Sequence, residues 1–371
     1  MKISGEGNVI LDANGANNHF TLASGGNLTL ANLTLINGYA TSGYASSIDA
    51  YSMSAKGLYV YDCNFVNNTN RDRVIDTQIP SDIKGCQFIN NSANTQVVRL
   101  YDNNQNLTYC VFINNRASGI LYSYNYKNDI NYNYWGFNTK PSTSSYGTAN
   151  ITGSGASNLT YWVILEITPD IDSISSRETQ TFTVGFDKYT DGSNVGTLET
   201  PMTLELDLSA LIGTLNQSTV LSGESFSYTA GTMGDETISL SYGDTVLSTE
   251  TFTVEASFGD KIYVGGEGAS DDNDGSINSP VATIAKAFEI VAASESDICT
   301  VFIANGDYTA SNISLPTNIS VNVFGAEKGN VRIKSDNVGK FIFSKITGDS
   351  SFMFENITFM DHYATGTSGA L

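Results

Sequence analysis

The hydrophobic and polar positions of the chain repeat three times in the same order between residues 62 and 115. Each copy has a Cys-x-Phe alternation followed by an Asn pair, over 62–68, 85–91 and 109–115, so the motif recurs at a short and nearly constant spacing. A unit this short cannot bury an apolar face alone, so equivalent positions of successive copies are expected to stack as coils. The alternation predicts a strand, and the Asn pair predicts a bend.

Stacked coils predict ladders of identical side chains, because neighbouring parallel strands lie about 4.8 Å apart. Further apolar runs at 58–60 and 74–76 recur in register and indicate three strands per coil. The asparagines are expected to stack at one bend, since asparagine tolerates a left-handed backbone. Asn67 and Asn90 are expected to be too buried for glycosylation. The predicted ladder residues are Cys63, Cys86, Cys110, Phe65, Phe88, Phe112, Asn67, Asn90 and Asn114.

The pattern changes after the first coils. Coils are predicted over residues 1–141, with aromatic residues at 132–135 covering the end of the stack, and a Ser/Thr/Gly-rich linker is predicted over 142–158. Longer strands with strict alternation over 159–256 predict an antiparallel sandwich of immunoglobulin-like size.

Residues 257–371 are predicted to begin a second stack. Apolar positions at 284, 287, 288 and 291 predict one amphipathic helix ahead of the strands. The predicted fold class is therefore all-β: a right-handed parallel β-helix, an immunoglobulin-like sandwich, and the N-terminal part of a second β-helix with a short capping α-helix.

The two coil regions match each other in sequence. The stretch from Gly329 to Ala364 reproduces the stretch from Gly7 to Ala40, with two residues inserted. We expect the chain to be part of a longer tandem array in which β-helix and sandwich alternate.

Charge is unevenly distributed. The formal net charge is −20, and residues 159–256 carry fifteen acidic and two basic residues. Such a surface repels phosphates and anionic lipid, so nucleic acid and membranes are not expected as partners. An acidic spacer whose orientation depends on calcium at the domain junctions is one hypothesis, and a purely solubilising charge is the alternative.

The number of glycosylation sequons indicates an extracellular protein. Asn-x-Ser/Thr occurs eleven times, as in exported glycoproteins. No apolar run is long enough to span a membrane. The four cysteines do not form a disulfide framework, because three of them belong to one ladder with parallel side-chain directions; reduced, buried thiols are expected.

Several motifs resemble the large adhesin-like surface proteins of methanogenic archaea. They include the Asp-Asn-Asp-Gly loop at 272–275, Ala304-Asn305-Gly306-Asp307-Tyr308, the repeated Asn-Ile-Thr-Phe and Phe-x-Asn-Asn, and Tyr134-Trp135-Gly136. That family joins pectin-lyase-like β-helices to bacterial-immunoglobulin-like domains. The resemblance implies a secreted cell-surface protein that attaches to glycans or to other cells, and it implies no catalytic residue.

The alternative function is a polysaccharide lyase or glycoside hydrolase, since β-helices also carry such enzymes. Asp76 and Arg99 fall at the same offset in adjacent coils, with Ser123 in the next, and are the candidate catalytic pair. No second carboxylate is expected at this position, so a stacked ion pair is the favoured interpretation.

Two other groups are candidates for binding. Aromatic residues near the end of the coils could stack on sugar rings, although covering the stack is the simpler role; they are Tyr124, Tyr126, Tyr134 and Trp135. Asp271, Asp272 and Asp274 could hold calcium, but they lack the rest of an EF-hand loop, so a solvated turn is favoured. No other cofactor is expected.

Overall fold

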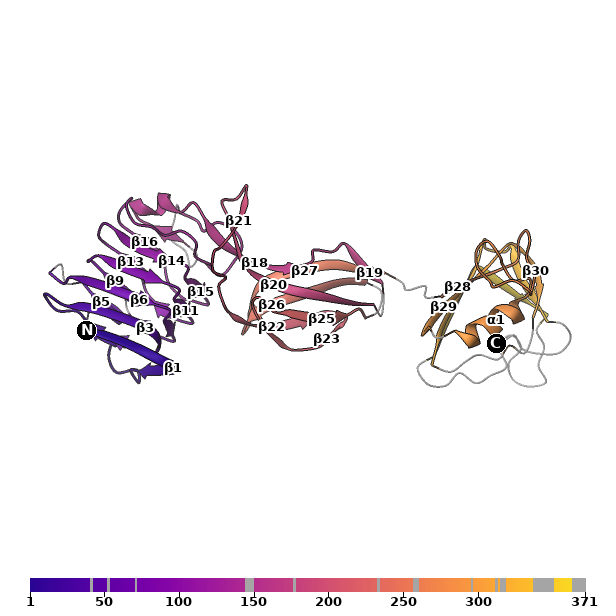
Figure 1. The fold of residues 1–371 in the computed structure, drawn as a ribbon, viewed down its shortest axis with the longest axis horizontal. Helices are drawn as coiled ribbons and strands as arrows, with labels where there is room; N and C mark the ends of the chain where they lie inside the picture. Colours follow the sequence, from indigo (N-terminus) through magenta and orange to yellow (C-terminus); the bar gives the residue numbers. More distant parts are fainter. Residues whose placement is uncertain are drawn as a thin grey trace. The chain divides into compact units, whose positions relative to one another are not determined.

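The computed structural model describes the chain except for residues 41–42, 52–53, 71, 144–149, 176–177, 232–233, 256–259, 295, 311–312, 314–317, 336–349 and 362–371. It forms two compact units, Met1–Glu255 and Ala256–Leu371 (Figure 1). Strands make up 55% of it and helix 5%, so the chain is mostly β, as predicted. No helix in the described part of the chain is long and apolar enough to cross a bilayer.

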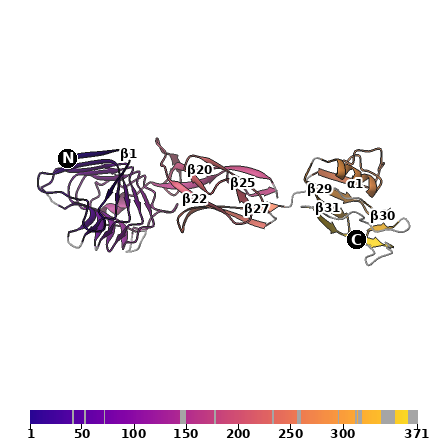
Figure 2. The ribbon, with the colours of Figure 1, turned by 90° about the horizontal axis from the view of Figure 1, so that it is seen from below.

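Parallel strands from successive coils build three sheets in the first unit (Figures 1 and 2). In one sheet β3 (Asn27–Ile36) pairs with β1 (Lys2–Asp12) and continues on two paths, through β6 (Gly57–Tyr61), β10 (Ser81–Lys84) and β14 (Gln105–Thr108), and through β7 (Asn64–Val66), β11 (Gln87–Ile89) and β15 (Val111–Ile113). The second sheet has the order β17 (Ile151–Thr152), β16 (Gly119–Ser123), β13 (Gln96–Leu100), β9 (Arg73–Thr77), β5 (Ala45–Ala50) and β2 (Phe20–Thr21). The third contains β12 (Ser92–Ala93), β8 (Thr69–Asn70) and β4 (Tyr39–Ala40).

The cysteine and phenylalanine ladders hold the coils together, as the repeat predicts. The ring centroids of Phe65 and Phe88 lie 4.9 Å apart, and those of Phe88 and Phe112 lie 4.8 Å apart. Trp135 extends this column, stacked on Phe112 at 5.0 Å. The apolar interior of each coil is thus covered by the same residue type in the next coil, which is how a solenoid buries a continuous core.

The asparagine ladder differs from the expectation by one residue. Asn67, Asn90 and Asn114 have the left-handed backbone, with φ of 56°, 55° and 54°, but they are exposed. The second asparagine of each pair makes the ladder: the Asn91 side-chain oxygen accepts from both Asn68 nitrogens, and that of Asn115 accepts from both Asn91 nitrogens. The prediction that Asn67 and Asn90 are too buried to be modified is therefore wrong.

The thiols offer a direct test of the ladder. All four cysteines are free and buried, and burial raises the pKa of Cys63 to about 12. Because the thiolate is the reactive form, a thiol reagent is expected to label none in the folded protein and four after unfolding without reductant. A count of two or fewer would contradict the ladder.

The region predicted as a linker is partly ordered structure. Ile151 and Thr152 pair with Leu121 and Tyr122 of β16, and a short 3₁₀ helix, η1 (Ser154–Asn158), follows. The Asn158 side-chain amide donates to the carbonyls of Tyr126 and Asn128. Residues 150–158 thus extend and close the coil stack.

Two sheets with a shared core form the second half of this unit. One has the order β18 (Trp162–Thr168), β20 (Thr179–Thr190), β25 (Ser225–Thr229) and β23 (Thr214–Leu215), with β21 (Val195–Thr197) on β20. The other has the order β19 (Ser173–Ser175), β27 (Thr245–Glu255), β26 (Gly234–Tyr242), β22 (Glu205–Ala210) and β24 (Thr219–Leu221). All pairs are antiparallel except β19 with β27. The strict alternation of residues 159–256 correctly predicted this arrangement of half-buried strands.

The coil stack and the sandwich share a core. Ile113 and Tyr134 from the coils pack in the same buried cluster as Phe186 of the sandwich, and the Tyr134 and Phe186 rings meet edge to face at 5.0 Å. Gln87 Nε2 also donates to the Thr203 carbonyl across this junction, at 3.0 Å. The junction between the coils and the sandwich is therefore packed and hydrogen-bonded and is not a hinge. The hypothesis that calcium sets the orientation of the sandwich does not apply at this junction.

The described residues of the second unit form two parallel sheets and one helix. The sheets have the orders β28 (Asp260–Val264), β29 (Ile298–Ile303), β31 (Ser320–Gly325), β33 (Ser351–Glu355), and β30 (Gly306–Thr309), β32 (Val331–Lys334), β34 (Ile357–Met360). Helix α1 (Ile284–Ala293) is preceded by Thr283, whose side chain caps the helix by accepting from the Lys286 amide. Its buried residues are the predicted ones, Ile284, Ala287, Phe288 and Val291.

Candidate functional site

A polar column crosses the sheet that contains β5, β9, β13 and β16. Asp49 pairs in register with Asp76, Asp76 with Arg99, and Arg99 with Tyr122. The prediction that Asp76 and Arg99 are neighbours is confirmed, whereas two details are wrong. Asp49 places a second carboxylate in the column, and Tyr122 rather than Ser123 follows Arg99.

The one-residue difference arises in a turn. Ser92 lies opposite Arg116 before the turn, and Gln96 lies opposite Gly119 after it. The later coil therefore crosses the turn with one residue fewer than the earlier coil. The spacing between the cysteines does not hold across this turn, which is why Ser123 was expected at the position that Tyr122 occupies.

Asp76 is the anchor of the column. Its side chain has no solvent exposure, and its Oδ1 accepts from Arg99 Nε at 2.7 Å while its Oδ2 accepts from Arg99 Nη2 at 2.8 Å. Arg73 Nη1 donates to the same Oδ2 at 3.3 Å. Burial raises the pKa of Asp76, and the two guanidinium groups oppose that shift. With both oxygens engaged and the side chain fully buried, this carboxylate positions the arginines and is not exposed to a substrate proton.

Aromatic rings flank the arginines. The Arg99 guanidinium carbon lies 5.0 Å from the ring centroid of Tyr51 and 4.7 Å from that of Tyr101. Tyr101 stacks on Tyr124 at 4.8 Å and on Tyr122 at 6.1 Å. Tyr101 is 38% exposed and Tyr124 47% exposed. The stack therefore leaves part of both tyrosines exposed beside a fixed positive charge.

A hollow of about 330 Å³ lies on this surface. Arg73 has a buried Nε with no hydrogen-bond partner among the described residues. We call this surface the arginine–tyrosine face. The hollow is lined by Arg73, Thr95, Gln96, Arg99, Tyr101, Ser118 and Tyr122.

The other aromatic candidates divide into two groups. Tyr126 is 69% exposed and remains available for stacking. Tyr134 and Trp135 are fully buried, Tyr134 in the junction core and Trp135 on the phenylalanine column. A sugar ring cannot reach either of them, so the prediction of carbohydrate binding at Tyr134 and Trp135 is wrong, and covering the coil end is their role.

The aspartate loop of the second unit is held by its own hydrogen bonds. Asp271 accepts from the Ala282 and Thr283 amides and from the Thr283 hydroxyl. Asp274 accepts from the Ser276 amide, and Asp272 is exposed. In the part of the chain that the structure describes, no three acidic, histidine or cysteine side chains are grouped as metal ligands. These bonds are those of a turn.

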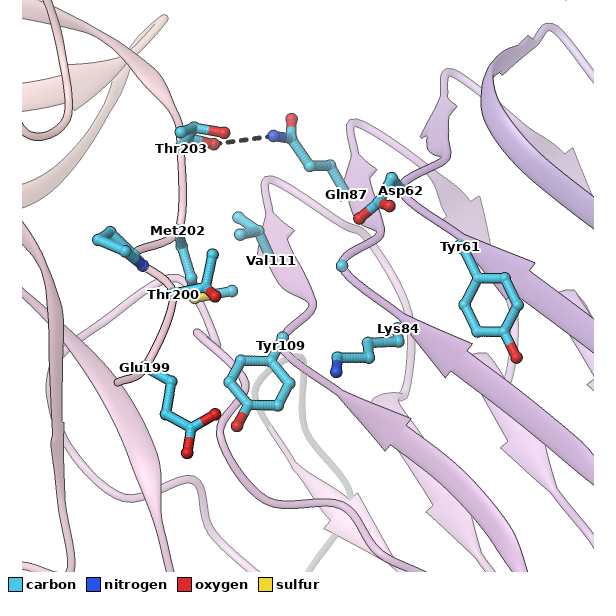
Figure 3. Close-up of a pocket in the computed structure, with 12 residues that line it drawn as sticks. Tyr61, Asp62, Lys84, Gln87, Tyr109, Val111, Glu199, Thr200, Met202 and Thr203 are labelled. Carbon is cyan, nitrogen blue, oxygen red and sulfur yellow. Dashed lines mark hydrogen bonds between the residues drawn. The ribbon is translucent and has the colours of Figure 1, made fainter. Parts of the chain in front are cut away.

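A second hollow, of about 380 Å³, lies where the sandwich meets the coils (Figure 3). Tyr61, Lys84 and Tyr109 face it from the coils, and the 199–203 loop closes it from the sandwich. The Lys84 ammonium lies 5.0 Å from the Tyr109 ring centroid, while Asp62 and Glu199 contribute carboxylates. With one cation and two carboxylates, this hollow suits an anionic ligand less well than the arginine–tyrosine face does.

Asp49, Tyr51 and Tyr101 were not predicted from the sequence. Asp49 lies further from Asp76 along the chain than one step of the cysteine repeat, so the repeat spacing does not identify it.

Comparison of the chain with protein-family models, with curated proteins and with solved structures finds no match.

Proposed function

We propose that the chain is a non-enzymatic attachment segment of an extracellular, cell-surface protein and that its arginine–tyrosine face binds glycans. The observation that carries the proposal is the exposed Tyr101–Tyr124 stack beside Arg73 and Arg99, both fixed by Asp76. Tyrosine rings offer apolar surface to sugar rings, and the guanidinium N–H groups that do not bind Asp76 can donate to carboxylate or sulfate groups. Acidic glycans are the ligand class that satisfies both features.

The wider setting is part of the same proposal. Three parallel sheets whose strands pair with those of the preceding and following coil support a right-handed parallel β-helix, and the two packed sheets support an immunoglobulin-like domain. A rigid junction suits a segment of a tandem array that carries load between surfaces. Calcium at the Asp271 loop has no support beyond the acidic composition.

Substitution of the two partly exposed tyrosines tests the proposal. The double variant Tyr101→Ala and Tyr124→Ala is expected to lose at least tenfold in affinity for a bound acidic glycan, since ring stacking contributes about 1 kcal/mol or more at each position. The measurement is a glycan array followed by titration calorimetry. Tyr39→Ala is the matched control, because Tyr39 is 39% exposed but belongs to a different sheet. Equal loss in the control, or unchanged affinity in the double variant, would reject this face.

The second candidate is a polysaccharide lyase or hydrolase. The observation in its favour is the raised pKa of Asp76 beside a second carboxylate, Asp49. However, Asp49 already accepts from the Tyr44 and Tyr51 amides, and Asp76 is bound by two arginines. Neither carboxylate is placed to exchange a proton with a substrate, which is why binding is the better-supported function.

A further inference from the structure

The hollow of about 380 Å³ between the coils and the 199–203 loop of the sandwich (Figure 3) is here called the junction hollow. Asp62, Gly85 and Tyr109 occupy the same place in successive coils beside it, and their φ values of 50°, 68° and 56° are left-handed. A Cβ at Gly85 would collide with Asp62 Oδ1. The absence of a side chain at Gly85 therefore lets the Asp62 carboxylate extend over the next coil, along the wall of the hollow.

The loop wall of the junction hollow is held at both ends by backbone hydrogen bonds. The Leu198 amide donates to the Asp187 carbonyl at 2.7 Å, and the Met202 amide donates to the Phe186 carbonyl at 3.0 Å. Met202 is also buried in the core that the coils and the sandwich share. A wall that is ordered before a ligand arrives lowers the entropic cost of binding.

Two tyrosine rings on the coil side are held in place as well. The Tyr61 hydroxyl donates to Asp82 Oδ2 at 3.0 Å. The Tyr109 ring stacks on Tyr132, with ring centroids 5.6 Å apart. Both Tyr61 and Tyr109 are partly exposed and line the hollow. Fixed aromatic rings with accessible surface suit the apolar C–H groups of a sugar ring.

The charged groups of the junction hollow are not paired with one another. The Lys84 ammonium lies 5.0 Å from the Tyr109 ring centroid. Among the described residues it makes no ion pair, and neither do the carboxylates of Asp62 and Glu199. One cationic donor and two anionic acceptors therefore line the same hollow without neutralising each other.

This mixture of charges favours a ligand that carries hydroxyl groups. An anionic ligand would face two carboxylates and a cationic ligand would face Lys84, whereas a hydroxyl group both donates and accepts. A volume of about 380 Å³ is at the lower end of the range for ligand pockets. We propose that the junction hollow binds an uncharged sugar unit, whose hydroxyls donate to Asp62 and Glu199 and accept from Lys84. This site and its ligand class are distinct from the acidic glycans proposed for the arginine–tyrosine face.

Saturation-transfer difference NMR of the full chain tests the proposal. The probes are the methyl glycosides of glucose, galactose and mannose, together with N-acetylglucosamine, and at least one of them is expected to bind. Its affinity should fall roughly tenfold in Lys84→Met and in Glu199→Gln, because each variant removes a charged hydrogen-bonding partner. Both side chains are exposed, so neither substitution alters the core. Circular dichroism checks that each variant is folded.

Two exposed residues outside the hollow provide matched controls. Lys127→Met and Glu6→Gln make the same chemical changes elsewhere on the coils, and sugar binding should be unchanged in both. The double variant Tyr101→Ala and Tyr124→Ala should also leave it unchanged, which separates this site from the arginine–tyrosine face.

Three results would overturn the proposal. One is that none of the four sugars binds at millimolar concentrations, including the case in which glycine binds instead, since a zwitterion also matches one cation and two carboxylates. Another is that Lys84→Met and Glu199→Gln leave sugar binding unchanged. The third is an equal loss of binding in the control variants. Failure of acidic-glycan binding at the arginine–tyrosine face changes none of these results.

Discussion

Replacing Glu236 by alanine is expected to lower the free energy of unfolding by about 3 kcal/mol, because it removes the acceptor of the buried Tyr228 hydroxyl and of several partly buried backbone amides. Glu236 is 1% exposed. Its carboxylate accepts from the Leu211 and Gly213 amides at 2.7 Å and from the Tyr228 hydroxyl at 2.6 Å. It thereby ties the 211–213 turn to the sandwich core. Chemical denaturation followed by fluorescence measures the change.

Two variants control this prediction. Glu205→Ala removes an exposed glutamate of the neighbouring strand β22 and is expected to change stability by less than about 0.5 kcal/mol. Tyr228→Phe removes one of the donors and should cost about 1–2 kcal/mol. If Glu236→Ala is no worse than Glu205→Ala, the carboxylate does not hold the turn.

Glu236 also makes a pH-dependent contribution. Burial alone would raise its pKa, but hydrogen bonds from Tyr228 and from backbone amides outweigh burial and hold the pKa below the ordinary 4.5. A carboxyl whose folded pKa is depressed stabilises the fold fully above its unfolded pKa, and this contribution is lost as pH falls through the folded pKa. The stability gap between wild type and Glu236→Gln should therefore be constant above about pH 5 and narrow at lower pH. A gap that widens on acidification would contradict this assignment.

The second large effect is expected from Asp76→Asn, which should cost about 3–5 kcal/mol because it leaves Arg73 and Arg99 without their buried counter-charge. Differential scanning calorimetry should show a lower melting temperature. Asp49→Asn is the matched control: Asp49 lies one coil away in the same column, and each of its two oxygens accepts from one backbone amide. An asparagine oxygen can still accept from one of these amides, so the expected cost is only about 1–2 kcal/mol. A cost for Asp49→Asn equal to that for Asp76→Asn would show that the arginine pairs do not set the stability of this column.

The coil architecture was predictable because its signal is repeated. Phe65, Phe88 and Phe112 each occupy the same place in their coil, so one spacing located all three members of the column. Helix α1 was predictable for a similar reason, since four apolar residues at helical spacing mark one buried face.

The site was predictable only where the spacing stayed constant. Asp76 and Arg99 are separated by the same number of residues as Cys63 and Cys86, so they were identified as neighbours. The turns that separate Asp49 from Asp76 and Arg99 from Tyr122 have other lengths. Asp49 was therefore not identified, and Ser123 was expected at the position that Tyr122 occupies. The burial of Tyr134 depends on the sandwich packing over the coil end, a contact between distant segments that no local pattern encodes. The exposed member of each Asn pair and the member that forms the hydrogen-bonded ladder could not be distinguished, because both residues fit a bend.

The most direct test of the central claim is affinity electrophoresis of the intact chain in gels containing polygalacturonate or alginate, with the polymer length analysed after prolonged incubation. The account predicts that migration is retarded, that retardation is lost with Tyr101→Ala and Tyr124→Ala, and that the polymer keeps its length. Shortened polymer whose formation requires Asp76 or Arg99 would contradict the account and establish an enzyme.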